Sequence, residues 1–270
     1  TTIGIYAFSG CDIAKTIWLT NTPPSGYSYA AGKINYVANN QYTQLSNVVV
    51  YPYLSLIFEV DGIKYVPVSP AERTCDAIDC IYDTAIETVN IGKTVSYKNI
   101  AMNVKEVMPY TCYKNKNIRN LTISNEGSIG YFAFEGCAGA SEITLGDGIT
   151  SIGESAFYNC SALNSVVLSD SIKTIGEYAF SGCSALPEIK IPQAVAEIGN
   201  YAFAGCSSLV NVIVEDRTAA LSLGSNGSSP LFADCPLDSV YIGGKISYET
   251  SSSYGYSPFY KKQGLKSLTI

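Results

Sequence analysis

Residues 152–168, IGESAFYNCSALNSVVL, contain the unit that decides the fold. The unit returns as IGEYAFSGCSALPEIKI at residues 175–191 and as IGNYAFAGCSSLVNVIV at residues 198–214. The start positions 152, 175 and 198 set an interval of 23 residues. Repeats of this length predict a solenoid, because one unit cannot bury its apolar face until neighbouring units stack on it.

The second half of each unit reads Leu-x-x-Val-x-Leu, and the alternation at its end predicts a short strand. We expect a β-rich, right-handed solenoid whose strands form one parallel sheet, with short irregular or 3₁₀ segments between them. Ten strands leave nine intervals, so at ~4.8 Å per interval the sheet would extend about 43 Å or more. A search for the strand pattern alone finds copies that begin at Ala14, Leu45, Ile86, Ile118, Ala140, Leu163, Leu186, Leu209, Leu237 and Leu265.

The spacing of these copies divides a single solenoid, residues 1–270, into three parts. Residues 20–117 hold irregular repeats with insertions, residues 118–214 hold regular repeats of 22–23 residues, and residues 215–270 hold longer repeats. Within the first part, Asp61-Gly62 stands between alternating apolar residues, which predicts a β-hairpin.

The phenylalanines and cysteines of the unit are expected to point inward, where equivalent side chains stack from coil to coil. We expect the cysteines to be free thiols that contact the backbone, because a metal site would need ligands at short spacing. Gly153 is expected to permit a tight corner where a Cβ would clash. The residues concerned are Phe134, Phe157, Phe180, Phe203, Cys137, Cys160, Cys183 and Cys206.

Cys75 and Cys80 lie close together in an insertion, outside the repeat pattern. A small disulfide between them and a pair of free thiols are equally weighted alternatives. Two thiolates without further cysteine or histidine do not make a zinc site.

The repeat I-G-x-x-A-F-x-x-C-x-x-L-x-x-[IV]-x-[IL] resembles the BspA-like class of leucine-rich repeats. The resemblance is strongest over residues 129–214, and it departs from the pattern where Cys112 takes the Phe position and Asn115 the Cys position. It implies a bacterial protein that is secreted or exposed at the cell surface, that adheres to matrix proteins or other cells, and that is not an enzyme.

Composition narrows the possible functions. The chain is 47% hydrophobic, which excludes a disordered chain. Its net charge is −6 and its Lys and Arg residues are not clustered, which argues against nucleic acid as a partner. It contains no His, the commonest general base and metal ligand, and we expect no cofactor. No apolar run is long enough to cross a bilayer. The first residues show no signal peptide, so we expect that one has been removed and that the chain is a fragment or a mature form.

In each strand the residue between the last two apolar positions should point away from the core. These residues and their outward neighbours predict a ligand-binding face, although β-branched residues also occur there simply because they suit strands. Trp18 and Tyr241 resemble interface anchors, and tyrosine-rich insertions would form the rims of the face. The candidate face comprises Trp18, Thr122, Glu142, Thr144, Val167, Glu188, Lys190, Ile213 and Tyr241.

The sequence therefore predicts a non-enzymatic binding or adhesion module that recognises a protein or extracellular-matrix ligand. A glycan-binding accessory protein is the alternative. A third hypothesis is a hydrolase that uses Glu142 and Glu188, which would lie two coils apart in one column.

Overall fold

The structure is a computed structural model. It describes residues 17–20, 27–30, 33–38, 41–45, 48–51, 57–69, 72–80, 86–224, 231–247, 258–259 and 264–269, and only the backbone before residue 57. All regular elements in these ranges are strands, connected by turns rather than by 3₁₀ segments. Across the same ranges, no helix has the length and hydropathy needed to cross a membrane. The first repeat copy, residues 3–11, lies outside the described residues.

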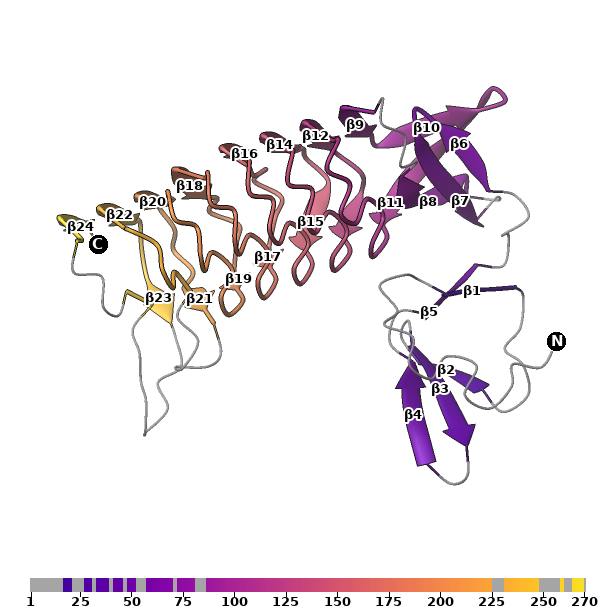
Figure 1. Cartoon of the computed structure of the whole chain (residues 1–270), viewed down its shortest axis with the longest axis horizontal. Coiled ribbons are helices and arrows are strands. Elements are labelled where there is room, and N and C mark those ends of the chain that lie inside the picture. The colour runs from indigo at the N-terminus through magenta and orange to yellow at the C-terminus, as the bar shows by residue number, and fades with distance from the viewer. Residues whose placement is uncertain are drawn as a thin grey trace.

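Ten strands lie where the Leu-x-x-Val-x-Leu pattern predicts them, and those that pair are parallel (Figure 1). Their registers align the apolar positions: Ile143 is opposite Leu121 and Val166 is opposite Ile143. The strands are β1 (Ile17–Thr20), β5 (Val48–Tyr51), β9 (Thr88–Ile91), β12 (Asn120–Ile123), β14 (Glu142–Leu145), β16 (Ser165–Val167), β18 (Glu188–Ile191), β20 (Asn211–Val214), β22 (Ser239–Ile242) and β24 (Ser267–Thr269).

The expectation of one ten-stranded sheet is wrong. The strands form a two-stranded sheet, β1-β5, and two four-stranded sheets, β16-β14-β12-β9 and β18-β20-β22-β24. The break between β16 and β18 has a cause in the sequence. In other coils the residue before the strand donates its N–H to the preceding coil, as Asn164 N does to Ser141 O and Val210 N does to Pro187 O. Pro187 occupies this position and has no N–H to donate.

A second sheet, which the sequence did not lead us to expect, runs beside the first row of strands (Figure 1). The residues before each Ile-Gly pair form its short strands, which pair in parallel from coil to coil, and Ile152 is opposite Ile175. The parallel strands are β11 (Ile100–Val107), β13 (Gly127–Ile129), β15 (Ile149–Ile152), β17 (Thr174–Ile175), β19 (Glu197–Ile198), β21 (Leu221–Leu223) and β23 (Ile246–Ser247).

Toward the N-terminus β8 (Thr74–Cys80) extends this second sheet, in parallel with β11. Antiparallel pairing then adds β7 (Ile63–Ser69) and β6 (Phe58–Val60), and β10 (Thr94–Tyr97) pairs with β11 antiparallel. The predicted hairpin joins β6 to β7, and Asp61 and Gly62 both adopt the left-handed conformation, with φ of 50° and 77°. Three further strands form a separate antiparallel sheet, β2 (Tyr27–Ala30), β3 (Lys33–Ala38) and β4 (Gln41–Leu45).

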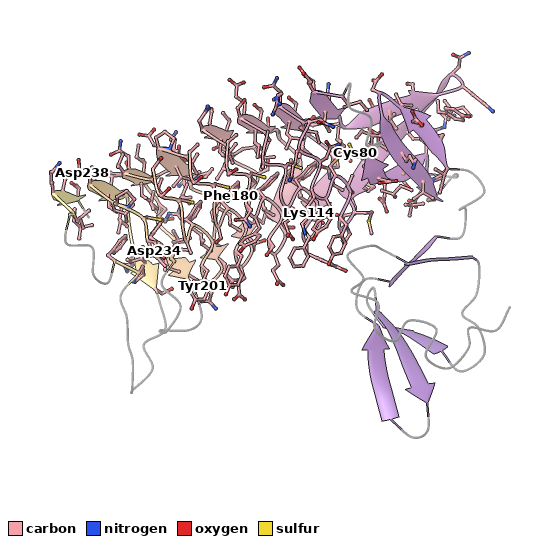
Figure 2. All side chains as sticks on the ribbon, viewed as in Figure 1. Cys80, Lys114, Phe180, Tyr201, Asp234 and Asp238 are labelled. Carbon is pink, nitrogen blue, oxygen red and sulfur yellow. The ribbon has the colours of Figure 1, made fainter. Side chains whose placement is uncertain are left out.

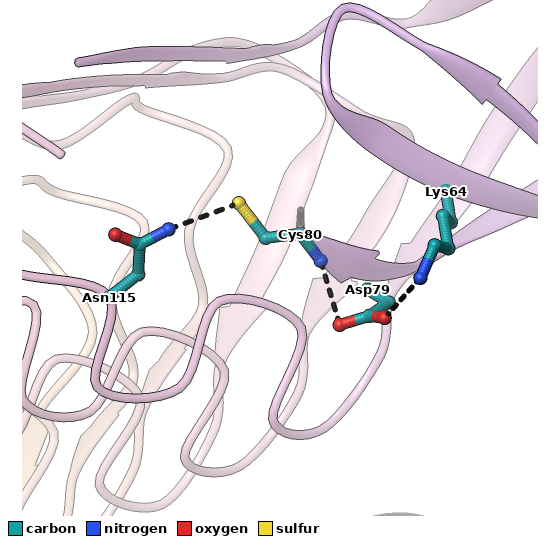
Figure 3. A network of polar contacts seen from close by, with 4 residues as sticks. All are labelled: Lys64, Asp79, Cys80 and Asn115. Atoms are coloured by element: carbon teal, nitrogen blue, oxygen red, sulfur yellow. Dashed lines mark hydrogen bonds and ion pairs between the residues drawn. The ribbon is translucent and has the colours of Figure 1, made fainter. Parts of the chain in front are cut away.

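The possible Cys75–Cys80 disulfide is not formed. Both thiols are free, and they lie five residues apart on the extended strand β8, which separates them by roughly 16 Å and puts them beyond disulfide reach. Cys80 instead contacts the coil that contains Cys112, where Asn115 Nδ2 donates to Cys80 Sγ at 3.7 Å (Figure 3). Beside it, Asp79 accepts from Cys80 N at 3.0 Å and pairs with Lys64 at 2.9 Å.

The core is a stack of phenylalanines between the two rows of strands, where Figure 2 shows Phe180. The predicted rings, Phe134, Phe157, Phe180 and Phe203, are completely buried, with centroids 5.2–5.6 Å apart. The stack continues to two rings that the sequence did not single out, Phe232 and Phe259.

The repeat cysteines form the expected ladder of free, buried thiols. Each thiol donates to a backbone carbonyl in the preceding coil, as Cys183 Sγ does to Phe157 O at 3.3 Å. Cys112 does stand in the Phe position, because its carbonyl accepts from Cys137 Sγ at 3.1 Å. The other thiols of the ladder that bond in this way are those of Cys160, Cys206 and Cys235.

The corner glycines permit the coils to approach one another. An added Cβ would lie 2.7 Å from Tyr131 N at Gly153 and 2.6 Å from Glu154 N at Gly176, closer than real Cβ atoms come to backbone. This confirms the expected role of Gly153, and the reason is the proximity of the neighbouring backbone.

Truncation of one ring in the stack should destabilise the solenoid strongly. We expect Phe180→Ala to lower the free energy of unfolding by about 3–5 kcal/mol, because it removes contacts with rings in both neighbouring coils. Urea denaturation followed by circular dichroism measures the loss. Val167→Ala, a change at a 54% exposed position, is the control and should cost less than about 0.5 kcal/mol. Equal losses in the two variants would refute the assigned core.

The ladder thiols should be unreactive in the folded protein. Burial raises the pKa of the Cys183 thiol, so at pH 8 the reactive thiolate is scarce and the reagent has no access. We expect iodoacetamide to leave Cys137, Cys160, Cys183 and Cys206 unmodified until denaturant is added, as mapped by peptide mass spectrometry. Rapid modification of these four residues before unfolding would contradict their placement.

Candidate interaction surfaces

The outward side chains of the predicted strands form aligned columns, which we call the strand face. In the first four-stranded sheet Thr122 pairs with Thr144 and Thr144 with Val167, and in the second Lys190 pairs with Ile213 and Ile213 with Tyr241. The neighbouring columns contain Glu142 and Glu188. The strand face is therefore two aligned patches, separated by the break before β18.

The strand face is open to solvent where it is described. Thr122, Glu142, Thr144, Glu188 and Lys190 are exposed, and Ile213 is half-buried. Two large side chains stand out among small polar ones, because Val167 is 54% exposed and Tyr241 is 38% exposed. The backbone of Trp18 lies in β1 opposite Val49, but its side chain is outside the described residues.

The side chains of the tyrosine-rich insertions that were expected to rim this face also fall almost entirely outside the described residues. The exception in the N-terminal group is Tyr65, which is buried and stacks on Phe58 with 5.5 Å between the ring centroids. This ring belongs to the core.

A shallow hollow lies on the second patch, which we call the Tyr241 hollow. Its volume is about 390 Å³, and it is lined by Ile213, Glu215, Asp216 and Tyr241. The two carboxylates follow β20 directly, which brings them beside the next strand. Sequence reasoning found Ile213 and Tyr241 but missed Glu215 and Asp216, because these residues stand just beyond the repeat pattern.

Polar contacts fix the groups around the Tyr241 hollow. Tyr241 Oη donates to Asp216 Oδ1, and this hydrogen bond raises the pKa of the Tyr241 phenol. Lys190 pairs with Glu215, which also accepts from Gln193 N at 3.0 Å, and the ion pair holds the pKa of the Glu215 carboxyl below its usual range. The hollow thus presents an aromatic ring and an aliphatic side chain beside one carboxylate, that of Asp216, which no ion pair among the described residues neutralises.

The two glutamates of the hydrolase hypothesis are not brought together. Glu142 lies on β14 and Glu188 on β18, in two different sheets, and both are exposed. Within the described ranges, acidic and cysteine side chains form no group that could hold a metal ion. This arrangement gives the hypothesis no support.

A second surface, which we call the turn ridge, was missed in the sequence. In several coils an aromatic residue stands one or two positions after the corner glycine, as Tyr178 does after Gly176. The sequence signal for this surface was therefore a tyrosine near the constant glycine, at a position whose residue type changes from repeat to repeat. Figure 2 shows Tyr201 at the outer edge of the turns, away from the strand face. The half-buried rings of the ridge are Tyr110, Tyr113, Tyr131, Phe132, Tyr158, Tyr178 and Tyr201.

The rings of the turn ridge form two groups. In the first, Tyr110 stacks on Phe132 at 5.3 Å and meets Tyr113 edge to face. In the second, Tyr178 stacks on Tyr201 at 4.9 Å and meets Tyr158 edge to face at 6.4 Å. Such arrangements are favourable for aromatic pairs, so the rings of each group stabilise one another.

Carboxylates accompany the rings. Glu154 and Glu177 occupy the same position in consecutive coils, directly after the corner glycines, and both are exposed. Partial burial, together with the charge of Glu177, raises the pKa of the Glu154 carboxyl. Burial raises the pKa of the Tyr178 phenol, and the charge of the adjacent Glu177 raises it further.

Comparison with known proteins gives a consistent family. A family model described as BspA type leucine rich repeat region matches residues 106–224 and 198–270, with six copies. Together these ranges cover more than half of the chain. No curated protein matches the sequence significantly.

Solved structures show the same fold. The chain is similar to a leucine rich cell surface protein from Faecalibacterium prausnitzii, with a TM-score of 0.60 and 20% identity over 78% of this chain. It covers 53% of that protein, so it spans about half of its length. It is also similar to a leucine rich repeat protein from T. pallidum, with a TM-score of 0.59 and 22% identity, covering 78% of this chain and 97% of that one.

Removal of the acceptor at the Tyr241 hollow should change the ionisation of its tyrosine. We expect Asp216→Asn to lower the pKa of the Tyr241 phenol toward its ordinary value, because the negative charge that opposes the phenolate is gone. NMR titration with ¹³C-labelled tyrosine measures the shift, and Tyr241→Phe assigns the resonance. A Tyr241 pKa that stays the same in Asp216→Asn would show that the hydrogen bond is absent in solution.

Proposed function

Because the chain belongs to the BspA-type leucine-rich repeat family, we propose that it is a non-enzymatic binding module that acts at, or outside, a bacterial cell surface. The Faecalibacterium relative is described as a cell surface protein, which supports this location. We propose further that the chain binds a protein or extracellular-matrix ligand through the strand face.

The observation that carries the proposal is the alignment of the outward columns. Parallel registers without a shift repeat one side-chain position every ~4.8 Å along β18, β20, β22 and β24. Solenoids commonly bind through such extended faces, since the core is built from other positions and the outward ones vary freely. The resulting surface is long, rigid and open to a macromolecule.

Energetically, the Tyr241 hollow is the best anchor on this face. Binding energy concentrates where an aromatic side chain fills or borders a depression among small residues. Ile213 contributes an apolar side chain to the lining of the hollow, and the hydrogen bond to Asp216 fixes the position of the Tyr241 ring. An ordered anchor loses less conformational entropy on binding, which favours affinity.

Ligand arrays would test the proposal. The immobilised full chain is probed with an array of extracellular-matrix proteins and with an array of glycans, and affinities for the strongest hits are measured by biolayer interferometry. Saturable binding to a protein, with glycans unbound, is the expected result. Binding to glycans alone would favour the glycan-binding alternative instead.

Loss of the anchor should weaken binding of the protein ligand. We expect Tyr241→Ala to cost more than about 1 kcal/mol, roughly fivefold in Kd, without a change in the thermal midpoint. Ile100→Ala is the matched control, because Ile100 is 53% exposed but lies on β11, outside the strand face. An affinity that is the same in both variants would place the site away from the Tyr241 hollow.

A further inference from the structure

One part of the turn ridge already binds a cation from within the chain. Lys114 Nζ lies 4.6 Å above the ring centroid of Tyr113, a cation–π contact. The Tyr113 phenol, by hydrogen bonding, and the Glu135 carboxylate favour the charged ammonium and raise the pKa of Lys114. In this coil, therefore, an aromatic ring holds a primary ammonium group, and the nearest coil supplies a carboxylate whose charge favours it.

The same two components recur further along the ridge without a cation. Tyr158 is the repeat equivalent of Tyr113, and the Lys114 position is taken by Asn159 in that coil. Over the described parts of the chain, Lys and Arg side chains neither cover the rings of Tyr158 and Tyr178 nor pair with Glu154 and Glu177. Among the described residues, therefore, Tyr158, Tyr178, Glu154 and Glu177 bring aromatic rings and carboxylates to one surface without a basic side chain in contact with them.

Backbone contacts hold this part of the ridge in place. Ser155 N donates to Glu177 O at 2.8 Å, and Tyr178 N donates to Asn200 O at 3.0 Å, so the turns are bonded coil to coil. Tyr178 and Tyr201 are both in the left-handed conformation, with φ of 54°. This conformation is costly for bulky residues, and here it aims two stacked rings outward.

From these observations we infer that Tyr158, Tyr178 and Tyr201, with Glu154 and Glu177, form a second docking site that takes arginine or lysine side chains from an extended segment of a partner protein. Arginine suits the site best, because its planar guanidinium both stacks on tyrosine rings and donates to carboxylates. The net charge of −6 attracts a basic segment from a distance. The site is separate from the strand face and does not depend on the function proposed for it.

A synthetic peptide with alternating arginines, acetyl-(Gly-Arg)₅-amide carrying a fluorophore, is the probe. Its binding to the full chain is measured by fluorescence anisotropy at two salt concentrations. The matched peptide has citrulline in place of arginine, which keeps the shape but removes the charge. The test variant is Glu154→Gln with Glu177→Gln. The control is Glu87→Gln with Asp147→Asn, which removes two exposed negative charges away from the ridge.

We expect the arginine peptide to bind and the citrulline peptide to lose binding. Glu154→Gln with Glu177→Gln should weaken the arginine peptide by about fivefold or more, and Tyr178→Leu should weaken it by a similar factor. The control pair should change binding by less than about twofold. Circular dichroism and the thermal midpoint establish that each variant is folded.

Three results would overturn the inference. Equal losses in the test and control pairs would mean that net charge alone attracts the peptide. A larger loss in Tyr241→Ala than in Glu154→Gln with Glu177→Gln would place the peptide on the strand face. Absence of binding at millimolar arginine peptide would exclude an arginine site.

Discussion

Successive coils meet backbone against backbone at Gly153, Gly176 and Gly199, and the other features of the solenoid follow from this contact. With no Cβ at the corner, the coils approach closely enough for amide groups to bond laterally in both rows of strands. The same approach brings phenylalanine rings to stacking distance and thiols to carbonyls. A side chain at the corner would push apart all of these contacts at once.

The corner glycines and the apolar positions recur together in each repeat, so the residues of the core could be predicted from the sequence. The Leu-x-x-Val-x-Leu pattern located all ten repeat strands, since its alternation places the apolar residues of each strand on one face even where insertions lengthen the interval. Asp61-Gly62 predicted its hairpin, because both residues must accept positive φ. The thiol ladder was predictable for a similar reason, as cysteines a full coil apart can stack but cannot jointly hold a metal.

What the sequence did not reveal depends on contacts between coils. The second sheet has strands as short as Thr174–Ile175, too brief for any periodicity to show. Pro187 breaks the first sheet through one missing N–H, which matters only once the neighbouring carbonyl is known. Cys75 and Cys80 are close in sequence but held apart by an extended strand. The turn ridge arises from tyrosines at variable positions, and only stacking makes them one surface.

The break at Pro187 also gives the solenoid a direction of easy bending. The sheet of β17 and its neighbours is continuous across this point, with Ser151 opposite Thr174 and Thr174 opposite Glu197, and the phenylalanine stack is continuous too. The strands β16 and β18 share no ladder. A load that spreads them apart therefore ruptures no backbone pairing, while the opposite side acts as a hinge. We therefore expect the two patches of the strand face to tilt relative to each other more readily than the strands within either patch do.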